Sequence, residues 1–254
     1  MSQSLQADRQ KSFLTMGQEP PLVLVYEDHA LIAVHKPAGQ LFHGYTKGAP
    51  GPLADQLKAY IKERYQKPGK VYLGVVHRLD RPVSGLCIFA RNSKFASRLS
   101  EQFQDHSLEK TYLALVEGVP ALPEAQLEDT LSFAADEAQE TAHDKVCTLS
   151  YQVIQTAEQR SLLAIRLGTG RRNQIRRQLA LHGLPIVGDV EHGARSLIPG
   201  TEALDPRFRP ILLHAWRLRL QHPSSFAPLE LRTPVPFYWE ALGSSWDLSQ
   251  ILLS

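Results

Sequence analysis

A short charged segment between two apolar runs is the part of this sequence best suited to chemistry. The segment His77-Arg78-Leu79-Asp80-Arg81-Pro82 follows an apolar run at 71–76 and precedes another at 86–90. Pro82 disfavours helical backbone at the residue before it, and Ser84-Gly85 is typical of a turn. The pattern therefore predicts strand, charged loop and strand, which is a rigid place from which to present side chains.

Asp80 is the only carboxylate in this segment, and Arg78 and Arg81 flank it. Nearby positive charge favours the charged form of a carboxyl group, so we expect Asp80 to be ionised at neutral pH. An ionised, oriented carboxylate can act as a nucleophile, a base or a metal ligand. The charge spacing alone is also typical of a surface loop with weak ion pairs, which leaves a purely structural Asp80 open.

Basic side chains cluster a second time. Arg171, Arg172, Arg176 and Arg177 fall within seven residues, and no acidic residue lies between 167 and 184. Thr169-Gly170 suits the start of a helix and Gly183 its end, which would place Arg172 and Arg176 on one face. A basic helix N-terminus favours phosphate, although the same composition also suits a solvated helix face.

The bulk composition bounds the class of protein. At 254 residues, with 43% apolar and 21% charged residues, the chain is typical of a soluble globular protein. A net charge of +2 does not by itself indicate nucleic-acid binding. Cys87 and Cys147 lie in apolar runs and are expected to be buried free thiols. Residues 1–17 do not resemble a signal peptide, and no apolar run approaches a membrane span, so we expect a cytoplasmic protein.

The remaining pattern predicts alternating strands and helices around these segments. Residues 1–20 are expected to be a flexible extension, 44–52 a mobile loop at the edge of a cleft, and 120–143 a surface connection. The predicted strands are 22–26, 30–34, 110–118, 146–155, 161–167, 211–220 and 229–233, and the predicted helices are 53–65, 94–104 and 239–252.

Four stretches together resemble one family. Residues 77–86 are similar to the motif of the RluA family of RNA pseudouridine synthases, in which His-Arg-Leu-Asp is followed by Ser-Gly. The others are the hairpin ending in Lys36-Pro37-Ala38-Gly39, the Lys-x-Tyr-x-Ala pattern at 110–114, and 169–176 with its sequel at 184–189. Asn173 stands where the family usually has histidine, and Arg177-Gln178 replaces Val-His. These departures affect RNA contact and substrate choice more than the chemistry.

The resemblance implies specific roles. Asp80 would be the catalytic residue, with Arg176 paired to it, and Tyr112 would pack on the target base and offer its hydroxyl for proton transfer. Residues that would bind RNA or substrate are His77, Arg78, Arg81, Lys110, Arg171, Arg172 and Gln174. The isomerisation requires no cofactor, and no histidine and cysteine cluster has metal-ligand spacing.

The resemblance also implies an α+β fold, the pseudouridine synthase fold, with an extended, largely antiparallel sheet and a central catalytic cleft. Residues 21–254 would form a stand-alone catalytic domain without an S4-like RNA-binding domain. We expect a monomer that isomerises uridine in rRNA or tRNA and has no membrane partner. A non-catalytic RNA-binding or RNA-chaperone protein on the same fold is the alternative. A glycosidase or nuclease ranks last, because no motif supplies a second carboxylate.

Overall fold

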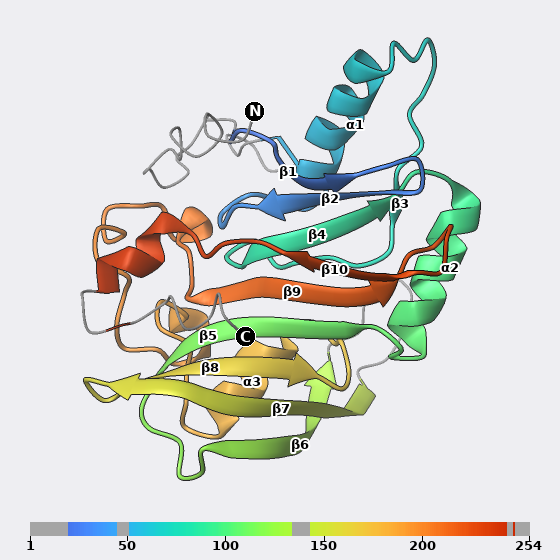
Figure 1. Cartoon of the computed structure of the whole chain (residues 1–254). Helices are drawn as coiled ribbons and strands as arrows, with labels where there is room; N and C mark the ends of the chain where they lie inside the picture. Colours follow the sequence, from blue (N-terminus) through green and yellow to red (C-terminus); the bar gives the residue numbers. More distant parts are fainter. Residues whose placement is uncertain (1–19, 45–50, 134–142, 243–245, 247–254) are drawn as a thin grey trace.

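The structure of the protein is a computed structural model that describes residues 20–44, 51–133, 143–242 and 246. Ten strands form one sheet in the order β1-β2-β4-β9-β5-β8-β7-β6, with β10 beside β9 and β3 beside β4 (Figure 1). The strands are β1 Val23–Glu27, β2 Leu31–Lys36, β3 Gly74–Val75, β4 Ser84–Ala90, β5 Glu109–Glu117, β6 Glu124–Phe133, β7 His143–Ala157, β8 Arg160–Leu167, β9 Leu213–Gln221 and β10 Pro228–Arg232.

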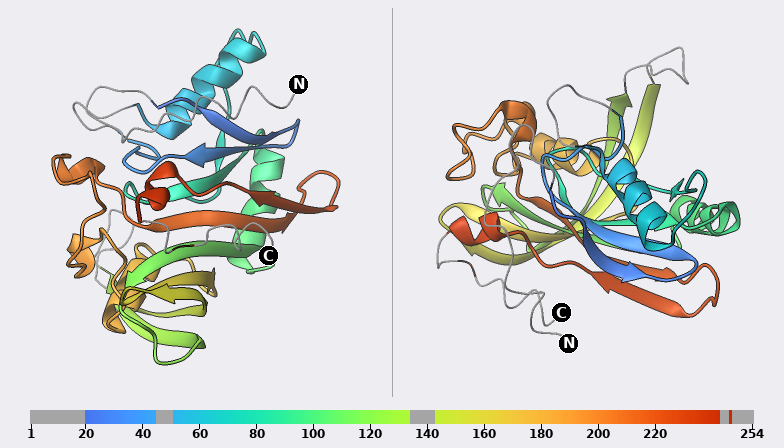
Figure 2. Two further views of the ribbon diagram at one scale, coloured as in Figure 1. Left: turned by 60° about the vertical axis from the view of Figure 1, so that its left-hand side comes forward. Right: turned by 90° about the horizontal axis from the view of Figure 1, so that it is seen from above.

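Helices cover both faces of this sheet (Figure 2). They are α1 Leu53–Arg64, α2 Ser93–Gln104 and α3 Gln174–Leu181, with short 3-10 turns at η1 Val190–His192, η2 Pro206–Phe208 and η3 Phe237–Leu242. Alternate residues of a strand point to opposite faces. Cys87 and Phe89 of β4 accordingly pack in the apolar cluster that includes α1 and α3, whereas Leu86 and Ile88 pack in the cluster that includes α2. The predicted α+β fold is confirmed.

Most of the predicted elements are present, and the exceptions are informative. Residues 124–133 form strand β6 rather than a surface connection, and Ser84-Gly85 begins β4 rather than making a turn. Helix α3 begins at Gln174, not at 169–170, because Asn173 adopts a left-handed conformation with φ 53°. The predicted extension and most of the 44–52 loop and the 239–252 helix lie outside the described residues. Cys87 and Cys147 are buried free thiols, as predicted.

Gly85 lies where the two halves of the sheet meet. Strand β4 pairs with β9 in parallel only at Ser84–His214 and Gly85–Ala215, and the other strand pairs are antiparallel. Gly85 has φ +125°, and a Cβ there would lie 2.4 Å from the carbonyl oxygen of Ala215. Only glycine tolerates both this backbone and this approach. The Ser-Gly of the motif is thus explained by the junction beside the Asp80 loop.

Gly85→Ala is expected to destabilise the protein by on the order of 3 kcal/mol or more, because the substitution adds backbone strain to a clash with main-chain atoms. Chemical denaturation measures the change. Gly69→Ala is the matched control, since a Cβ at Gly69 has no neighbour within 4 Å. The control should change stability by less than about 0.5 kcal/mol. Equal stabilities for the two variants would contradict the proposed close approach.

A buried polar network lies behind the same junction. Tyr238 Oη donates to Ser84 Oγ at 3.0 Å, and Ser84 Oγ lies 2.8 Å from His214 Nδ1. His214 Nε2 lies 3.3 Å from the carbonyl oxygen of Thr233. The hydrogen bonds are all satisfied with His214 neutral, its Nε2–H donating to Thr233. Burial, with a further contribution from His35, lowers the pKa of His214 to about 3.

This histidine predicts a loss of stability in mild acid. The unfolded state has an ordinary histidine pKa and binds a proton as the pH falls from 7 to 5, whereas folded His214 does not, so stability falls. Its share is about 2 kcal/mol at pH 5 relative to pH 7. Urea denaturation of His214→Gln should show a shallower decline over this range than the wild type. Parallel declines would show that His214 is not a buried neutral group.

Candidate active site

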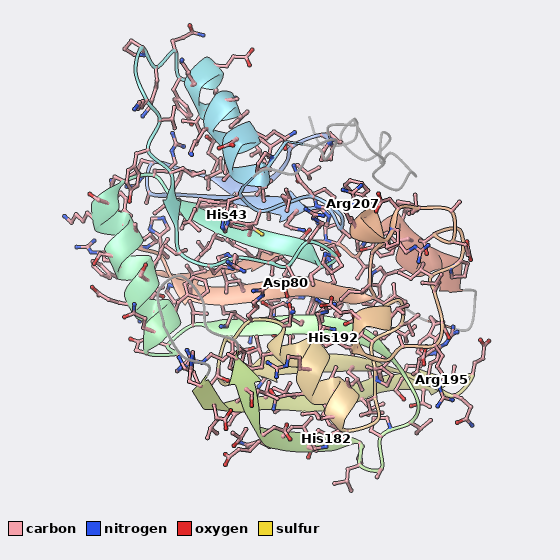
Figure 3. The ribbon with its side chains drawn as sticks, turned by 180° about the vertical axis from the view of Figure 1, so that it is seen from behind. His43, Asp80, His182, His192, Arg195 and Arg207 are labelled. Carbon is pink, nitrogen blue, oxygen red and sulfur yellow. The ribbon has the colours of Figure 1, made fainter. Side chains whose placement is uncertain are left out.

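A cavity of about 520 Å³ opens where the Asp80 loop faces β5 and the segment that leads into α3. The cavity wall has five parts: 76–80 with Val83; Lys110 and Tyr112 of β5; residues 167 and 169–176; Phe103, Gln104 and His106 at the end of α2; and Leu213 of β9. Figure 3 shows Asp80 over the middle of the sheet, on the face where α3 lies. Three of the four stretches that resemble the RluA family therefore meet in one cleft.

Lys36 holds the Asp80 loop in place. Its side chain is fully buried, and Nζ donates to the carbonyl oxygens of Pro37 at 3.0 Å, Arg81 at 3.1 Å and Val83 at 2.8 Å. The amide of Gly39 donates to the same Arg81 carbonyl at 2.8 Å. Burial lowers the pKa of Lys36 to about 8, although the nearby Cys87 and Asp80 oppose this shift. Lys36-Pro37-Ala38-Gly39 is thus an anchor for the Asp80 loop as well as the end of a strand.

The Asp80 side chain is half-buried, and no described residue binds its carboxylate. Within the described part of the chain, its carboxylate accepts no hydrogen bond and forms no ion pair; only its backbone carbonyl is used, by the amide of Val83 at 3.2 Å. A carboxylate in a cleft without a protein partner is available to a ligand.

Arg176 does not pair with Asp80, and this expectation was wrong. The Arg176 guanidinium is buried and donates to both carboxylate oxygens of Asp189 at 2.7 Å. It also donates to Glu191 at 2.8 Å and Asn173 at 3.3 Å. Burial opposes the charge of Arg176, but the hydrogen bonds and charge of Asp189 outweigh it and raise the arginine's pKa. Arg176 therefore fastens α3 to the 189–191 segment.

Gln174 is a structural residue of the cleft rather than an open RNA contact. Its side chain is buried, and its carbonyl oxygen accepts from Thr169 Oγ1 at 2.8 Å and the amide of Arg171 at 3.0 Å. Its amide nitrogen donates to Thr148 at 3.0 Å and to Gln178 at 2.9 Å. Every hydrogen-bonding position of the side chain is filled. Gln174 shapes the loop that presents Arg171.

The departures from the family pattern also have structural roles. Gln178 is fully buried and donates to Asp129 at 2.8 Å and to the carbonyl of Cys147 at 3.0 Å. The Arg177 guanidinium lies over the ring of Phe133 at 4.9 Å and donates to the carbonyl of Ser132 at 2.9 Å. Both side chains fasten α3 to the β6–β7 hairpin.

Tyr112 reaches into the cleft from β5. The ring is half-buried, and no described residue hydrogen-bonds its hydroxyl. Burial raises the pKa of Tyr112 well above its usual value of 10, and the fields of Cys87 and Asp80 add to the shift. The side chain is therefore a neutral phenol at physiological pH, with Asp80 near enough to influence it.

The remaining predicted residues divide between the cleft and its surroundings. His77 lines the cleft, and its Nε2 accepts from the amide of Ile88 at 2.9 Å. Exposed Arg78, Arg171 and Arg172 and half-buried Lys110 also line it. Arg81 does not line this cavity. Burial lowers the pKa of its guanidinium; the charge of Arg207 adds to this shift, and that of Asp205 opposes it.

Sequence reasoning missed the residues at and just after the end of α2 that line the cleft. Phe103 and Gln104 were predicted only as part of the helix at 94–104, and no role was predicted for His106. His106 follows the helix with φ 58°, which turns the chain toward β5. A helix that ends immediately before the Lys-x-Tyr strand is the one signal that places its last turn beside Lys110.

Comparisons with known proteins identify the family of this chain. The sequence profile described as RNA pseudouridylate synthase matches residues 30–181. The chain is 31% identical to tRNA pseudouridine synthase C of Vibrio cholerae, over 91% of this chain and 98% of that protein. The protein of the same name in Pectobacterium carotovorum is also 31% identical, over 93% of this chain but 65% of that protein. Ribosomal large subunit pseudouridine synthase D of Pseudomonas aeruginosa is 29% identical, over 92% of this chain and 75% of that protein.

A solved structure shows the same fold. The protein titled Human RNA Pseudouridylate Synthase Domain Containing 4 aligns with a TM-score of 0.70 and 24% identity, covering 87% of this chain and 91% of that one. The profile match includes β2, the Asp80 loop, Tyr112 and α3. With a profile match over more than half of the sequence and relatives that align along nearly its whole length, this chain belongs to the family of RNA pseudouridylate synthases, isomerases that convert uridine in RNA to pseudouridine.

Proposed function

We propose that this chain isomerises one or more uridines of tRNA or ribosomal RNA, with Asp80 as its catalytic carboxylate. The uncommitted Asp80 side chain in a cleft lined by cationic residues is the observation that supports this most strongly. A partnered or buried carboxylate would not be free to meet a substrate. The relatives carry names that refer to tRNA or to the large ribosomal subunit, so both RNA classes are substrates to test.

The reaction sets the tasks of the cleft. The bond from uracil N1 to the sugar breaks, the base rotates, C5 bonds to the sugar, C5 loses its proton and N1 gains one. Atoms and electrons balance without an oxidant or a transferred group. Asp80 acts on the sugar or the base, and Tyr112 packs on the uracil. The target nucleotide has to leave its stack to reach this depth, as base-modifying enzymes generally require.

The wider organisation of the protein is part of the proposal. Residues 21–254 act as a catalytic domain in the cytoplasm, as a monomer. No helix in the described residues is long and apolar enough to cross a membrane. The non-catalytic RNA-binding alternative does not require the carboxylate of Asp80 to remain free in the cleft, so the site favours the enzyme.

The loss of the C5 proton provides a direct assay. Purified protein is incubated with tRNA and rRNA that carry tritium at uridine C5. These RNAs are transcribed from templates, or taken from cells, so that they do not already contain the modification. We expect tritium to be released to water in proportion to the pseudouridine formed. Binding of these RNAs without tritium release would contradict the enzymatic proposal and favour the RNA-binding alternative.

Arg171 and Arg172 are expected to hold the RNA backbone, because both are exposed on the rim of the cleft. Each lost phosphate contact reduces the slope of log K against log salt by about 0.9 for duplex and about 0.7 for single strands. The double variant Arg171→Ala/Arg172→Ala should therefore bind RNA more weakly and with a flatter salt dependence. Lys62→Ala/Lys94→Ala, which removes the same charge from exposed sites outside the cleft, is the control. A slope unchanged from the wild type would remove both arginines from the RNA surface.

A further inference from the structure

Lys110 points into the cleft beside Tyr112. The two residues are separated by one position on β5, and alternate residues of a strand share a face. Both line the cavity. Glu109 points to the opposite face, where its carboxylate pairs with Arg217 at 3.3 Å and Arg166 at 3.5 Å. The acid that adjoins Lys110 in sequence is therefore not available to neutralise it.

The Lys110 side chain is half-buried, and no residue in the described part of the chain gives it an anionic partner. Among the described residues, it forms neither a hydrogen bond nor an ion pair, although burial lowers its pKa. A charge removed from water without a partner is costly, so such groups usually meet a counter-charge. The position suits an anion that arrives with the substrate.

An aromatic stack fixes the ammonium in this position. Nζ lies 5.5 Å from the centroid of the Phe103 ring, and the same ring stacks on His77 at 4.9 Å and 17°. Burial and the charge of Lys110 lower the pKa of His77 to about 3, so the imidazole is neutral and adds no second charge. The cation–π contact holds Lys110 in place and leaves its hydrogen-bond donors free.

The loop that carries Arg171 passes close to the same ammonium. A Cβ at Gly170 would lie 3.3 Å from Nζ, so glycine keeps the space in front of Lys110 clear. Arg78, Arg171 and Arg172 line the same cleft. The region around Nζ is therefore positive and confined, which suits a phosphate better than a neutral carbonyl.

We propose that Lys110, supported by Phe103 and His77, forms an anion subsite for a phosphate that flanks the target uridine, while the uracil packs at Tyr112. This rests on the proposed function, because it assumes that the uracil occupies the Tyr112 end of the cleft. Two positions along a strand span about 6.6 Å, a separation that one nucleotide can bridge. The contact forms when the RNA binds and persists through the reaction. It therefore stabilises the bound substrate and the transition state equally, which raises affinity and not the rate of the chemical step.

The test replaces single phosphates of the RNA. The probe is a synthetic stem–loop with one uridine in its loop, made as a series in which each linkage in turn near that uridine is an uncharged methylphosphonate. We expect wild-type affinity to fall roughly 10-fold or more at one linkage, the usual scale of a charge-assisted hydrogen bond. Lys110→Met should bind the unmodified RNA more weakly by a similar factor. Methylphosphonate at the sensitive linkage should then reduce the affinity of this variant no further.

Controls separate this role from a general loss of structure. Lys62→Met removes an exposed lysine outside the cleft and should retain the full wild-type pattern. Phe103→Leu keeps Lys110 but removes the ring beneath it. In this variant, methylphosphonate should reduce affinity less than in the wild type at the sensitive linkage, with no change at the other linkages. The single-turnover rate of saturating Lys62→Met on modifiable RNA should stay within about threefold of the wild type.

The possible outcomes distinguish the two proposals. If methylphosphonate reduces the RNA affinity of Lys110→Met as much as that of the wild type at every linkage, Lys110 binds no phosphate. A wild-type protein that binds the stem–loop with no sensitive linkage also overturns the subsite. If the linkage effect is present but tritium is never released from any RNA, the subsite stands and the proposed function fails.

Discussion

Asp80→Asn is expected to abolish pseudouridine formation while leaving folding and RNA affinity close to wild type. The substitution keeps the size of the side chain and removes its charge. Since the carboxylate makes no hydrogen bond or ion pair within the described structure, no structural interaction is lost with it. Loss of a catalytic carboxylate typically costs roughly 10⁴-fold or more in turnover. The assay is tritium release, with denaturation and RNA binding measured on the same preparation.

Asp205→Asn is the matched control for this experiment. Asp205 lies close enough to Arg81, the residue after Asp80, for its charge to affect that arginine, but its carboxylate is bound by Arg207 at 2.6 Å and does not line the cleft. We expect this variant to keep most of its activity. Turnover by Asp80→Asn near the wild-type rate would show that the chemistry lies elsewhere.

Tyr112→Phe is expected to retain RNA binding but to lose turnover by roughly 10²–10⁴-fold, the usual size of a general acid–base contribution. Phenylalanine keeps the face on which the uracil packs, so affinity should be preserved. The hydroxyl is missing from the step in which C5 loses its proton. A single-turnover assay with saturating enzyme isolates this step from binding and release.

The raised pKa of Tyr112 adds a constraint to this prediction. Because the free enzyme holds a neutral phenol, the hydroxyl has to pass on its own proton as it receives one from C5. The wild-type rate should therefore show no increase near pH 10 from ionisation of this tyrosine. A Tyr112→Phe rate within about threefold of the wild type would leave the ring only a packing role, and water or Asp80 would accept the proton.

The local pattern around Asp80 was sufficient to predict a rigid loop between strands. Pro82 and the apolar runs on either side determine that conformation through short-range effects. The strand that carries Lys110 and Tyr112 follows in the same way from alternation. What the sequence could not show is which distant segments approach the loop. The three carbonyls held by Lys36 and the contact of Gly85 with Ala215 depend on tertiary packing.

The α3 region illustrates why the rest was missed. Four arginines near one another look equivalent in sequence, but only Arg176 lies within reach of Asp189, and the pair buries both side chains. Asn173 takes a left-handed conformation that delays the helix, which frees Arg171 and Arg172 to form a loop. Strand β6 was missed because its exposed polar residues alternate with half-buried and buried ones at an edge of the sheet, where polar composition does not exclude a strand.

The most direct test of the central claim is a map of pseudouridine in tRNA and rRNA from cells that lack this gene. The cells are compared with others in which the gene is restored as wild type or as Asp80→Asn. We predict that one or more specific pseudouridines disappear on deletion, return with the wild-type gene and stay absent with Asp80→Asn. An unchanged map after deletion, or full restoration by Asp80→Asn, would contradict the assignment of this cleft as a pseudouridine synthase site.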